Sequence, residues 1–283
     1  MRTALIYLLF LGTVTFGAEI HPPAQTTAGV SITIQTGGSG DATFYLVGPA
    51  AVSKRNVQAG SDISVDSDQL EHAGRYVAIL CAPEGCASAQ FFVQPAAPNK
   101  LTFLVHPSRV PVDSTNAISA VAFVQDNFRN LVLKPEAVTF SILPKGGNPV
   151  SASRSSEHAV AWARLSSAHK EGSTRLGAAI GNANEIRVVQ QVAADACNLR
   201  IKSIRSTKGV LVETDPVRDC AGNAVPDGTV VSFTKSDAAG KTTVDVPIKK
   251  GIAKIEMPVE GGARITVASG VVTGNELQIG GQP

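Results

Sequence analysis

The chain has 283 residues, a formal net charge of +2, and only 17% charged and 5% aromatic side chains. This length suits two or three domains, and the abundance of Val, Ala, Ser, Thr and Gly favours short strands and tight turns. The basic residues form no cluster, which excludes a nucleic-acid-binding surface, and the lack of an apolar stripe at helical spacing predicts few helices.

The first residues, MRTALIYLLFLGTVTFGAE, place Arg2 ahead of an apolar run that ends near Phe16. A membrane-spanning helix needs about 20 apolar residues, so this run is too short to span a bilayer. The small residues Gly17 and Ala18 follow it at a position suited to cleavage. We therefore predict a secretory signal peptide at residues 1–18, with an uncleaved anchor as the alternative. The mature protein is expected in the periplasm, at the cell surface or in the medium, without an integral membrane span.

Residues 19–96 are expected to form the first domain. The stretches VSITIQT, ATFYLVG, RYVAIL and AQFFVQ are rich in β-branched and aromatic residues and are separated by Gly, Pro and Asp, which predicts several short strands. The run from Leu70 through Gly74 to Tyr76 resembles the tyrosine corner of immunoglobulin-like sandwiches, in which the phenol hydroxyl bonds to upstream backbone. These features predict a divergent immunoglobulin-like β-sandwich.

The rest of the chain contains an internal repeat, so residues 98–193 and 194–283 are expected to form two related domains. The stretch QDNFRNLVLKPEAVTFS returns 93 residues later as RDCAGNAVPDGTVVSFT. Four residue types recur at the same offsets, and they are Asp126, Asn130, Val138 and Phe140 in the first copy and Asp219, Asn223, Val231 and Phe233 in the second. A repeat of about 90 residues is too long for a solenoid unit and suits a sandwich domain of roughly 100 residues. The joints are predicted near residues 94–100 and 190–196.

The second copy of the repeat predicts a strand–loop–strand connector. Asp219 follows a strand and is expected to accept hydrogen bonds from backbone N–H groups. Gly222 and Asn223 tolerate positive φ and allow the chain to reverse. Pro226 and Gly228 frame a second turn, and the alternation after it points every other side chain into the core. Nothing in this connector requires a catalytic role.

The pattern D-x-x-G-N-x-V-P-D-G-T-x-V-x-F, from Asp219 to Phe233, is similar to the signature of group 1 bacterial immunoglobulin-like domains, which build the extracellular stalks of the intimin and invasin adhesins. The second domain matches with weaker turn chemistry, so the resemblance covers about two thirds of the chain. It implies an all-β chain of three tandem immunoglobulin-like sandwiches with Greek-key connections and a role in display or adhesion. No stretch resembles the anchoring and recognition parts of those adhesins, so the target stays open.

All four cysteines lie in the exported part of the chain, and an even number there favours disulfides. Three pairings are possible, and proximity favours Cys81–Cys86 across a hairpin and Cys197–Cys220 between the first strand of the third domain and the Asp219 loop. Closing that loop is worth about 3 kcal/mol in the chain-entropy estimate. A redox-active pair is the alternative for Cys81 and Cys86, but their spacing is not C-x-x-C.

The remaining polar residues give no pattern typical of an active site. There is no nucleophile elbow, and the five histidines are dispersed. The acidic residues Asp62, Asp66 and Asp68 lack the spacing of a calcium loop, which favours a solvated strand edge. We therefore expect no catalytic residue, no metal and no cofactor.

Three aromatic residues are candidates for an interaction surface, namely Phe91, Phe92 and Trp162. Phe91 and Phe92 point to opposite faces of one strand, so one of them is expected to be exposed. Trp162 is ambiguous, and core packing is favoured because few other large side chains are available to fill three sandwiches.

The leading hypothesis is a non-catalytic exported protein that acts as a spacer or adhesion module of the bacterial cell envelope. Its partner would be a protein or an envelope polysaccharide. The alternative is a module that binds carbohydrate or peptide through the first domain, and a third option is an accessory to an extracellular enzyme.

Overall fold

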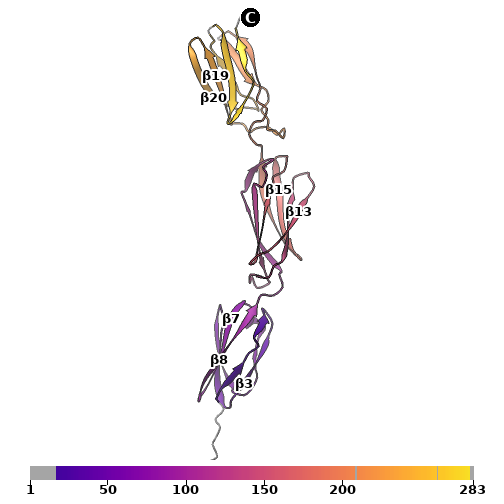
Figure 1. The fold of residues 1–283 in the computed structure, drawn as a ribbon, viewed down its shortest axis with the longest axis vertical. Helices are drawn as coiled ribbons and strands as arrows, with labels where there is room; N and C mark the ends of the chain where they lie inside the picture. Colours follow the sequence, from indigo (N-terminus) through magenta and orange to yellow (C-terminus); the bar gives the residue numbers. More distant parts are fainter. Residues whose placement is uncertain (1–16, 208, 260, 281–283) are drawn as a thin grey trace, which may run out of the picture.

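The computed structural model describes residues 17–207, 209–259 and 261–280, and almost all of their regular structure is β-strand. The one helical element in the described part of the chain is a short 3-10 turn, η1 (Ser67–Leu70). The strands form three pairs of sheets, and Figure 1 shows these pairs as three bodies in a row. The predicted signal peptide lies almost entirely outside the described residues, which begin at Gly17.

The first sandwich contains strands β1 to β8. Its smaller sheet has the order β1 (Glu19–His21), β3 (Ile32–Gly37), β6 (Ile63–Val65). Its larger sheet has the order β2 (Gln25–Thr27), β8 (Gly85–Gln94), β7 (Gly74–Ala82), β4 (Asp41–Val47), β5 (Val52–Gln58). Alternate residues of these strands face inward and form one core around Phe44, Leu80 and Phe91.

The second sandwich contains strands β9 to β16. Its smaller sheet has the order β14 (Val160–Leu165), β11 (Ile118–Gln125), β9 (Lys100–His106). Its larger sheet has the order β10 (Arg109–Pro111), β16 (Ala183–Val192), β15 (Gly172–Ile180), β12 (Ala137–Leu143), β13 (Val150–Ser155). The repeat residues Val138 and Phe140 lie on β12 and are fully buried in the core between the two sheets.

The third sandwich contains strands β17 to β24. Its smaller sheet has the order β17 (Ile201–Ser206), β18 (Gly209–Thr214), β21 (Lys254–Met257). Its larger sheet has the order β20 (Gly240–Pro247), β19 (Val230–Asp237), β22 (Ala263–Ser269), β23 (Val272–Thr273), and β24 (Leu277–Ile279) also pairs with β22. Val231 and Phe233 occupy β19 as their counterparts occupy β12, and both are fully buried.

The prediction of an all-β chain with three tandem immunoglobulin-like sandwiches is confirmed. The first two sandwiches share one feature. A short second strand, β2 or β10, pairs in parallel with the last strand of the same sandwich. The described part of the third sandwich has no such strand. The last strands of the first two sandwiches end at Gln94 and Val192, and the next strands begin at Lys100 and Ile201. The domain limits at residues 96–98 and 193–194 stay predictions.

Candidate functional site at the two joints

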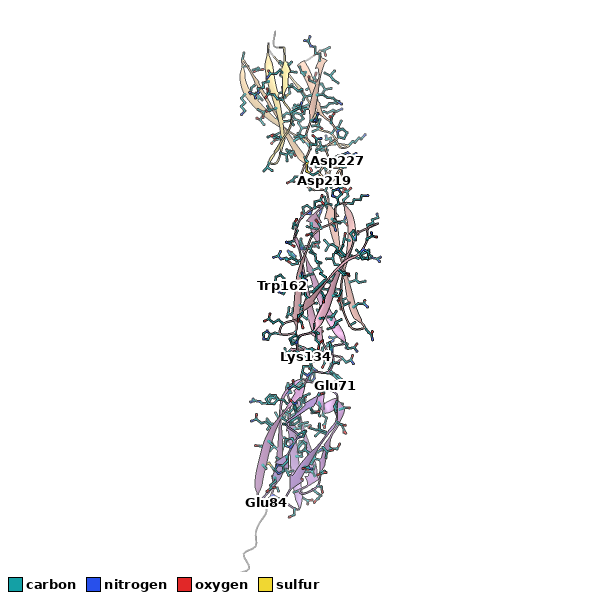
Figure 2. All side chains as sticks on the ribbon, turned by 45° about the vertical axis from the view of Figure 1, so that its right-hand side comes forward. Glu71, Glu84, Lys134, Trp162, Asp219 and Asp227 are labelled. Atoms are coloured by element: carbon teal, nitrogen blue, oxygen red, sulfur yellow. A yellow bond between two sulfur atoms is a disulfide. The ribbon has the colours of Figure 1, made fainter. Side chains whose placement is uncertain are left out.

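The repeated Asp-x-x-x-Asn loops lie where one sandwich meets the next. We call the contact of residues 126–130 with residues 71–73 and 96 the first joint, and the contact of residues 219–223 with residues 169–171 and 194 the second joint. Figure 2 shows Glu71 and Lys134 on either side of the first joint and Asp219 at the second.

Both loops have the same backbone. The N–H of Asp126 donates to the carbonyl of Asn130 over 3.0 Å, and Asp219 and Asn223 form the equivalent bond over 3.0 Å. A tight turn lies inside each loop, closed by bonds of 3.1 Å from Arg129 to Asp126 and from Gly222 to Asp219. The residue in the left-handed region is Gly222, at φ 83°, or Arg129, at φ 68°. Asn223 does not adopt positive φ, contrary to its predicted role, and acts through its side chain instead.

The asparagine side chain of each loop crosses to the preceding sandwich. Asn130 donates from Nδ2 to the carbonyl of Glu71 over 2.7 Å, and its Oδ1 accepts from the N–H of Ala73 over 2.8 Å. Asn223 makes the same pair of bonds with the carbonyl of His169 and the N–H of Glu171, over 3.3 and 3.4 Å. The amide thus pairs with backbone as a neighbouring strand would, and it satisfies a donor and an acceptor that the preceding sandwich leaves open.

The aspartate of each loop fixes both the asparagine and the connecting segment. Asp126 accepts from Asn130 Nδ2 over 2.8 Å and from the N–H of Ala96 over 2.9 Å. Asp219 accepts from Asn223 Nδ2 over 3.0 Å and from the N–H of Ala194 over 3.0 Å. Asp126 is 0% exposed and Asp219 is 4% exposed, so these carboxylates exchange water for fixed donors.

The pKa of Asp219 reflects this environment. Burial alone would raise the pKa, but the Asn223 side chain and the N–H groups of Ala194, Asn223 and Ala221 hydrogen-bond to the charged form and lower it overall. The carboxylate is therefore held ionised at neutral pH.

The two joints differ in what locks them. At the first joint the half-buried ring of Phe128 packs against the core of the first sandwich. Gly29 makes room for it: a Cβ there would lie 2.4 Å from Cζ of the ring, and the backbone has φ +76°. The position equivalent to Phe128 in the second joint holds Ala221, which is too small to reach across.

The second joint contains a disulfide instead. Cys197 and Cys220 are joined, with their Cα atoms 4.9 Å apart. The N–H of Cys197 also donates to the carbonyl of Arg218 over 3.0 Å. Cys197 lies in the connecting segment ahead of β17 and not in the first strand of the third domain, where the sequence placed it. The bond therefore ties the connecting segment to the Asp219 loop and does not touch the second sandwich.

The turn after the second loop contains a contact that the sequence did not reveal. Thr229 donates its N–H to the carbonyl of Pro226 over 3.2 Å, and Gly228 has φ 94°. Asp227 accepts from the N–H groups of Lys250 and Gly251 over 2.8 and 3.0 Å. The bond from Gly251, followed by that from Lys250, lowers the pKa of Asp227. Only the fold brings residues 227 and 251 together.

The tyrosine-corner residues of the first sandwich lie beside the first joint. Tyr76 donates its hydroxyl to the carbonyl of His72 over 3.0 Å, and its ring stacks on Phe91 at a centroid distance of 5.4 Å. Burial raises the pKa of Tyr76. Gly74, at φ 146°, begins the strand that carries it. The corner therefore holds the segment that Asn130 contacts.

The other disulfide lies far from both joints. Cys81 faces Cys86 across the β7–β8 hairpin, and the two are bonded with Cα atoms 4.0 Å apart. Glu84, in the turn of this hairpin, lies at the opposite end of the first sandwich from Glu71 (Figure 2).

The three candidate surface aromatics have different environments. Phe91 is 0% exposed, so its assignment to an interaction surface is wrong, whereas Phe92 is 50% exposed. Trp162 is 63% exposed, so the favoured interpretation as a core residue is also wrong. The inward positions of β14 belong to Ala161 and Ala163, and alternation turns Trp162 outward.

Trp162 is part of an apolar row across the smaller sheet of the second sandwich. It pairs in register with Val121 on β11, and Val121 pairs with Leu104 on β9. Leu104 is 52% exposed, and Val121 is half-buried. We call these three residues the Trp162 row.

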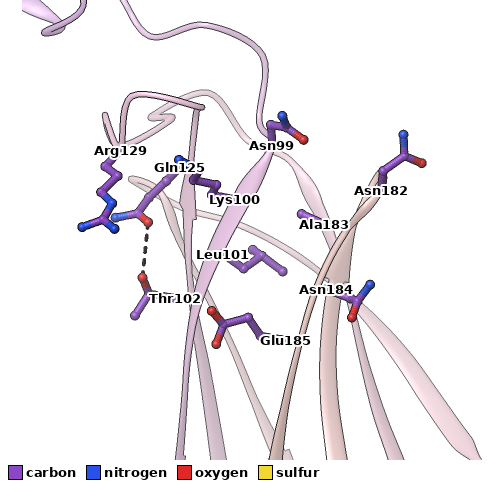
Figure 3. Close-up of a pocket in the computed structure, with 10 residues that line it drawn as sticks. All are labelled: Asn99, Lys100, Leu101, Thr102, Gln125, Arg129, Asn182, Ala183, Asn184 and Glu185. Carbon is purple, nitrogen blue, oxygen red and sulfur yellow. Dashed lines mark hydrogen bonds between the residues drawn. The ribbon is translucent and has the colours of Figure 1, made fainter.

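A polar cleft of about 580 Å³ lies beside the first joint, between β9 and the start of β16. Figure 3 shows the amide, basic and acidic side chains that line it and the 3.2 Å hydrogen bond between Thr102 and Gln125. No aromatic ring lines this cleft, so its chemistry is limited to hydrogen bonding and ion pairing.

The acidic residues Asp62, Asp66 and Asp68 do not assemble a metal site. Within the described ranges, no group of three or more His, Cys, Asp or Glu side chains is arranged to hold a metal ion. No helix in the same part of the chain is long and apolar enough to cross a membrane.

Comparisons with known proteins give a structural likeness. No protein-family model and no curated protein matches the chain. The chain is similar to the structure of FdeC, an Escherichia coli adhesin, with a TM-score of 0.61 and 12% identity over 93% of this chain and 96% of that one. Invasin, a bacterial integrin-binding protein, gives a TM-score of 0.45 and 12% identity over 91% of this chain and 57% of that one. The FN1–FN3 domains of chicken CNTN1 give 0.40 and 12% over 93% and 97%. The likeness to FdeC supports the tandem sandwich fold.

Proposed function

We propose that this protein is a non-catalytic, exported spacer of the bacterial cell envelope, whose three sandwiches hold an adhesive surface at a fixed distance. The observation that carries the proposal is the repeated joint. The same aspartate and asparagine occur at both contacts and use the same atoms for the same partners. A freely jointed linker would need none of these hydrogen bonds between neighbouring sandwiches.

Several features support the exported location. Both disulfides belong to the oxidising compartments outside the cytoplasm. The N-terminal sequence has the composition of a signal peptide, and the fold resembles that of a bacterial adhesin.

An adhesive role is favoured over a purely passive one by the Trp162 row. Tryptophan is enriched among the residues that dominate protein interfaces, neighbouring exposed apolar side chains mark interaction sites, and Trp162 is the only tryptophan of the chain. Its partner would be a protein or an envelope polysaccharide.

The stiffness of the joints is measurable by small-angle X-ray scattering on the mature chain. We expect an elongated particle with one well-defined maximum dimension. The variant Asn130→Ala/Asn223→Ala removes both bridging amides and should shorten and broaden the distance distribution. The control Asn56→Ala changes an exposed asparagine on β5, away from both joints, and should leave the distribution unchanged. If the bridging variant keeps the wild-type dimension, the joints do not set the spacing and the proposal fails.

A further inference from the structure

The larger sheet of the second sandwich has an apolar groove on its outer face, away from the Trp162 row. The groove has a volume of about 570 Å³ and is lined by Leu143, Pro144 and Val188 together with two cations, Lys145 and Arg175. No acidic residue lines it. Because β15 begins just after Glu171, the groove lies at the end of the sandwich nearest the second joint.

The floor of the groove is one register row. Val188 on β16 pairs with Arg175 on β15, and Arg175 pairs with Leu143 on β12. Val188 is 59% exposed and Leu143 is 40% exposed. An arginine thus stands between two apolar side chains on the outer face of the sheet.

The wall of the groove is the turn after β12. The N–H of Gly147 donates to the carbonyl of Pro144 over 3.2 Å, which closes this turn. Lys145 lies over the start of β15: a Cβ built on Gly172 would stand at an ordinary contact distance of 3.5 Å from the Lys145 Cδ. The lysine is one of the residues that line the groove.

Neither cation is neutralised. Among the described residues, no ion pair or side-chain hydrogen bond reaches the Lys145 ammonium or the Arg175 guanidinium, although other exposed cations of the chain, such as Arg187 and Arg264, are paired. An apolar groove flanked by two unpaired cations is complementary to a ligand with an apolar body and carboxylates.

We propose that this groove binds an extended acidic peptide segment of a partner protein, with an apolar side chain between carboxylates. A carboxylate would pair with Arg175, and apolar side chains would cover Leu143 and Val188. A sugar is disfavoured because no aromatic ring lines the groove. A membrane surface is disfavoured because the site is recessed and has two cations, whereas lipid-binding patches have about 4–8. A spacer requires no such groove, so this proposal goes beyond the proposed function.

The test is fluorescence polarisation with the mature chain and the fluorescein-labelled peptide DDLDLDD. We expect saturable binding that weakens as salt is added, weaker binding of DDSDSDD, and none of KKLKLKK. Arg175→Glu and Lys145→Glu should each weaken binding about tenfold, because attraction becomes repulsion. Arg175→Lys should retain most of it. The control Arg154→Glu reverses an exposed charge on β13 of the same sheet and should bind as the wild type does. Trp162 fluorescence verifies that each variant is folded.

Three results would overturn the proposal. The first is no binding of DDLDLDD, and the second is equal binding by the wild type and by Arg175→Glu/Lys145→Glu. The third is that the groove has another occupant. If the wild type self-associates in sedimentation and Arg175→Glu/Lys145→Glu does not, the groove belongs to a second copy of the chain. If the wild type binds phosphatidylserine vesicles but no peptide, and the double variant binds neither, the groove belongs to lipid. Scattering of the double variant should show the wild-type length, so failure here leaves the joints untouched.

Discussion

The two joints share one polar framework and differ in the residue placed beside it. The first has Phe128, whose ring reaches the core of the preceding sandwich. The second joint has Ala221 at the equivalent position. Its disulfide, Cys197–Cys220, ties the connecting segment only to the sandwich that follows. The bridging bonds of Asn223 are also longer than those of Asn130, at 3.3 and 3.4 Å against 2.7 and 2.8 Å. We infer that the first joint is the stiffer one and that bending concentrates at the second.

We infer from this difference that two repeats can keep the same entry of the chain into the next sandwich and still differ in the stiffness of the joint. The aspartate and asparagine define how the chain enters the next sandwich, because they bind backbone on both sides. The position two residues after the aspartate decides whether apolar surface is buried between sandwiches. The Phe128 ring opposes movements that separate it from the first sandwich, whereas the Cys197–Cys220 bond restrains the connecting segment and adds no contact with the second sandwich.

The largest expected effect is the loss of the second disulfide. Cys197→Ser/Cys220→Ser should lower the free energy of unfolding of the third sandwich by about 3 kcal/mol, since the unfolded chain regains the freedom of that loop. The third sandwich has neither Trp nor Tyr, so hydrogen exchange read by mass spectrometry is the suitable measurement. Protection of β19 and β22 should fall, and protection in the second sandwich should not.

The control for this change is Cys81→Ser/Cys86→Ser. It removes a bond between residues 5 apart in sequence instead of 23, so the effect should be smaller and confined to the first sandwich. Equal losses in the second and third sandwiches after removal of Cys197 would show that the second joint couples them as strongly as the first couples its neighbours.

The second effect concerns the aromatic contact at the first joint. Phe128→Ala should destabilise the first sandwich by about 2 kcal/mol, less than the 3–5 kcal/mol typical of a fully buried ring, because Phe128 is half-buried. The change lies in the second sandwich but its cost should appear as faster hydrogen exchange in β3 and β7. Phe92→Ala, at a half-exposed position of the first sandwich itself, should change exchange little. If Phe128→Ala left exchange in β3 and β7 unchanged while Phe92→Ala accelerated it, the Phe128 contact would not stiffen the first joint.

The third effect is a pH dependence at the second joint. The pKa of Asp219 is lowered in the folded chain, so the carboxylate contributes stability above its ordinary pKa of 3.8, and this contribution is lost as the pH falls through the lower folded value. Acid should therefore release the contacts to Ala194 and Asn223. Asp219→Asn should lower stability already at neutral pH and remove that part of the acid response. Scattering and hydrogen exchange between pH 5 and pH 2 test this, and an unchanged acid response in the variant would contradict it.

Much of the fold was accessible from the sequence because it depends on alternation and turn chemistry. The repeat spacing of Asp, Asn, Val and Phe placed two equivalent loops and two equivalent core strands in the correct sandwiches. The faces of single strands were harder to predict. The outward position of Trp162 depends on which residues of β14 face the core, and its small neighbours Ala161 and Ala163 give a weak signal.

The joints were accessible only in part. The sequence identified Asp219 and Asn223 as turn residues, but their partners at Ala194, His169 and Glu171 follow from how two sandwiches meet. Cys197 was predicted within a strand, but β17 begins only at Ile201. The N–H of Cys197 bonds to the carbonyl of Arg218 as the N–H of Asn99, also ahead of its strand, bonds to that of Gln125. The groove at Arg175 depends on register between three strands, which no local pattern specifies.

The smallest expected effect comes from two substitutions that should change the free energy of unfolding in opposite directions. They test most directly whether the two loops are equivalent. Arg129 and Gly222 occupy the same left-handed position. Gly222→Ala meets nothing within 4 Å, so its cost is the left-handed penalty of about 1–2 kcal/mol, offset in part by a less flexible unfolded chain, which is worth about 0.4–1 kcal/mol. Arg129→Gly reverses both terms and should stabilise the second sandwich by up to about 1 kcal/mol. Urea unfolding followed by Trp162 fluorescence measures the effect of Arg129→Gly on the second sandwich. Hydrogen exchange measures the effect of Gly222→Ala on the third. Two effects of the same sign would mean that the shared backbone of the loops is not retained in solution, and the comparison of the joints would lose its common reference.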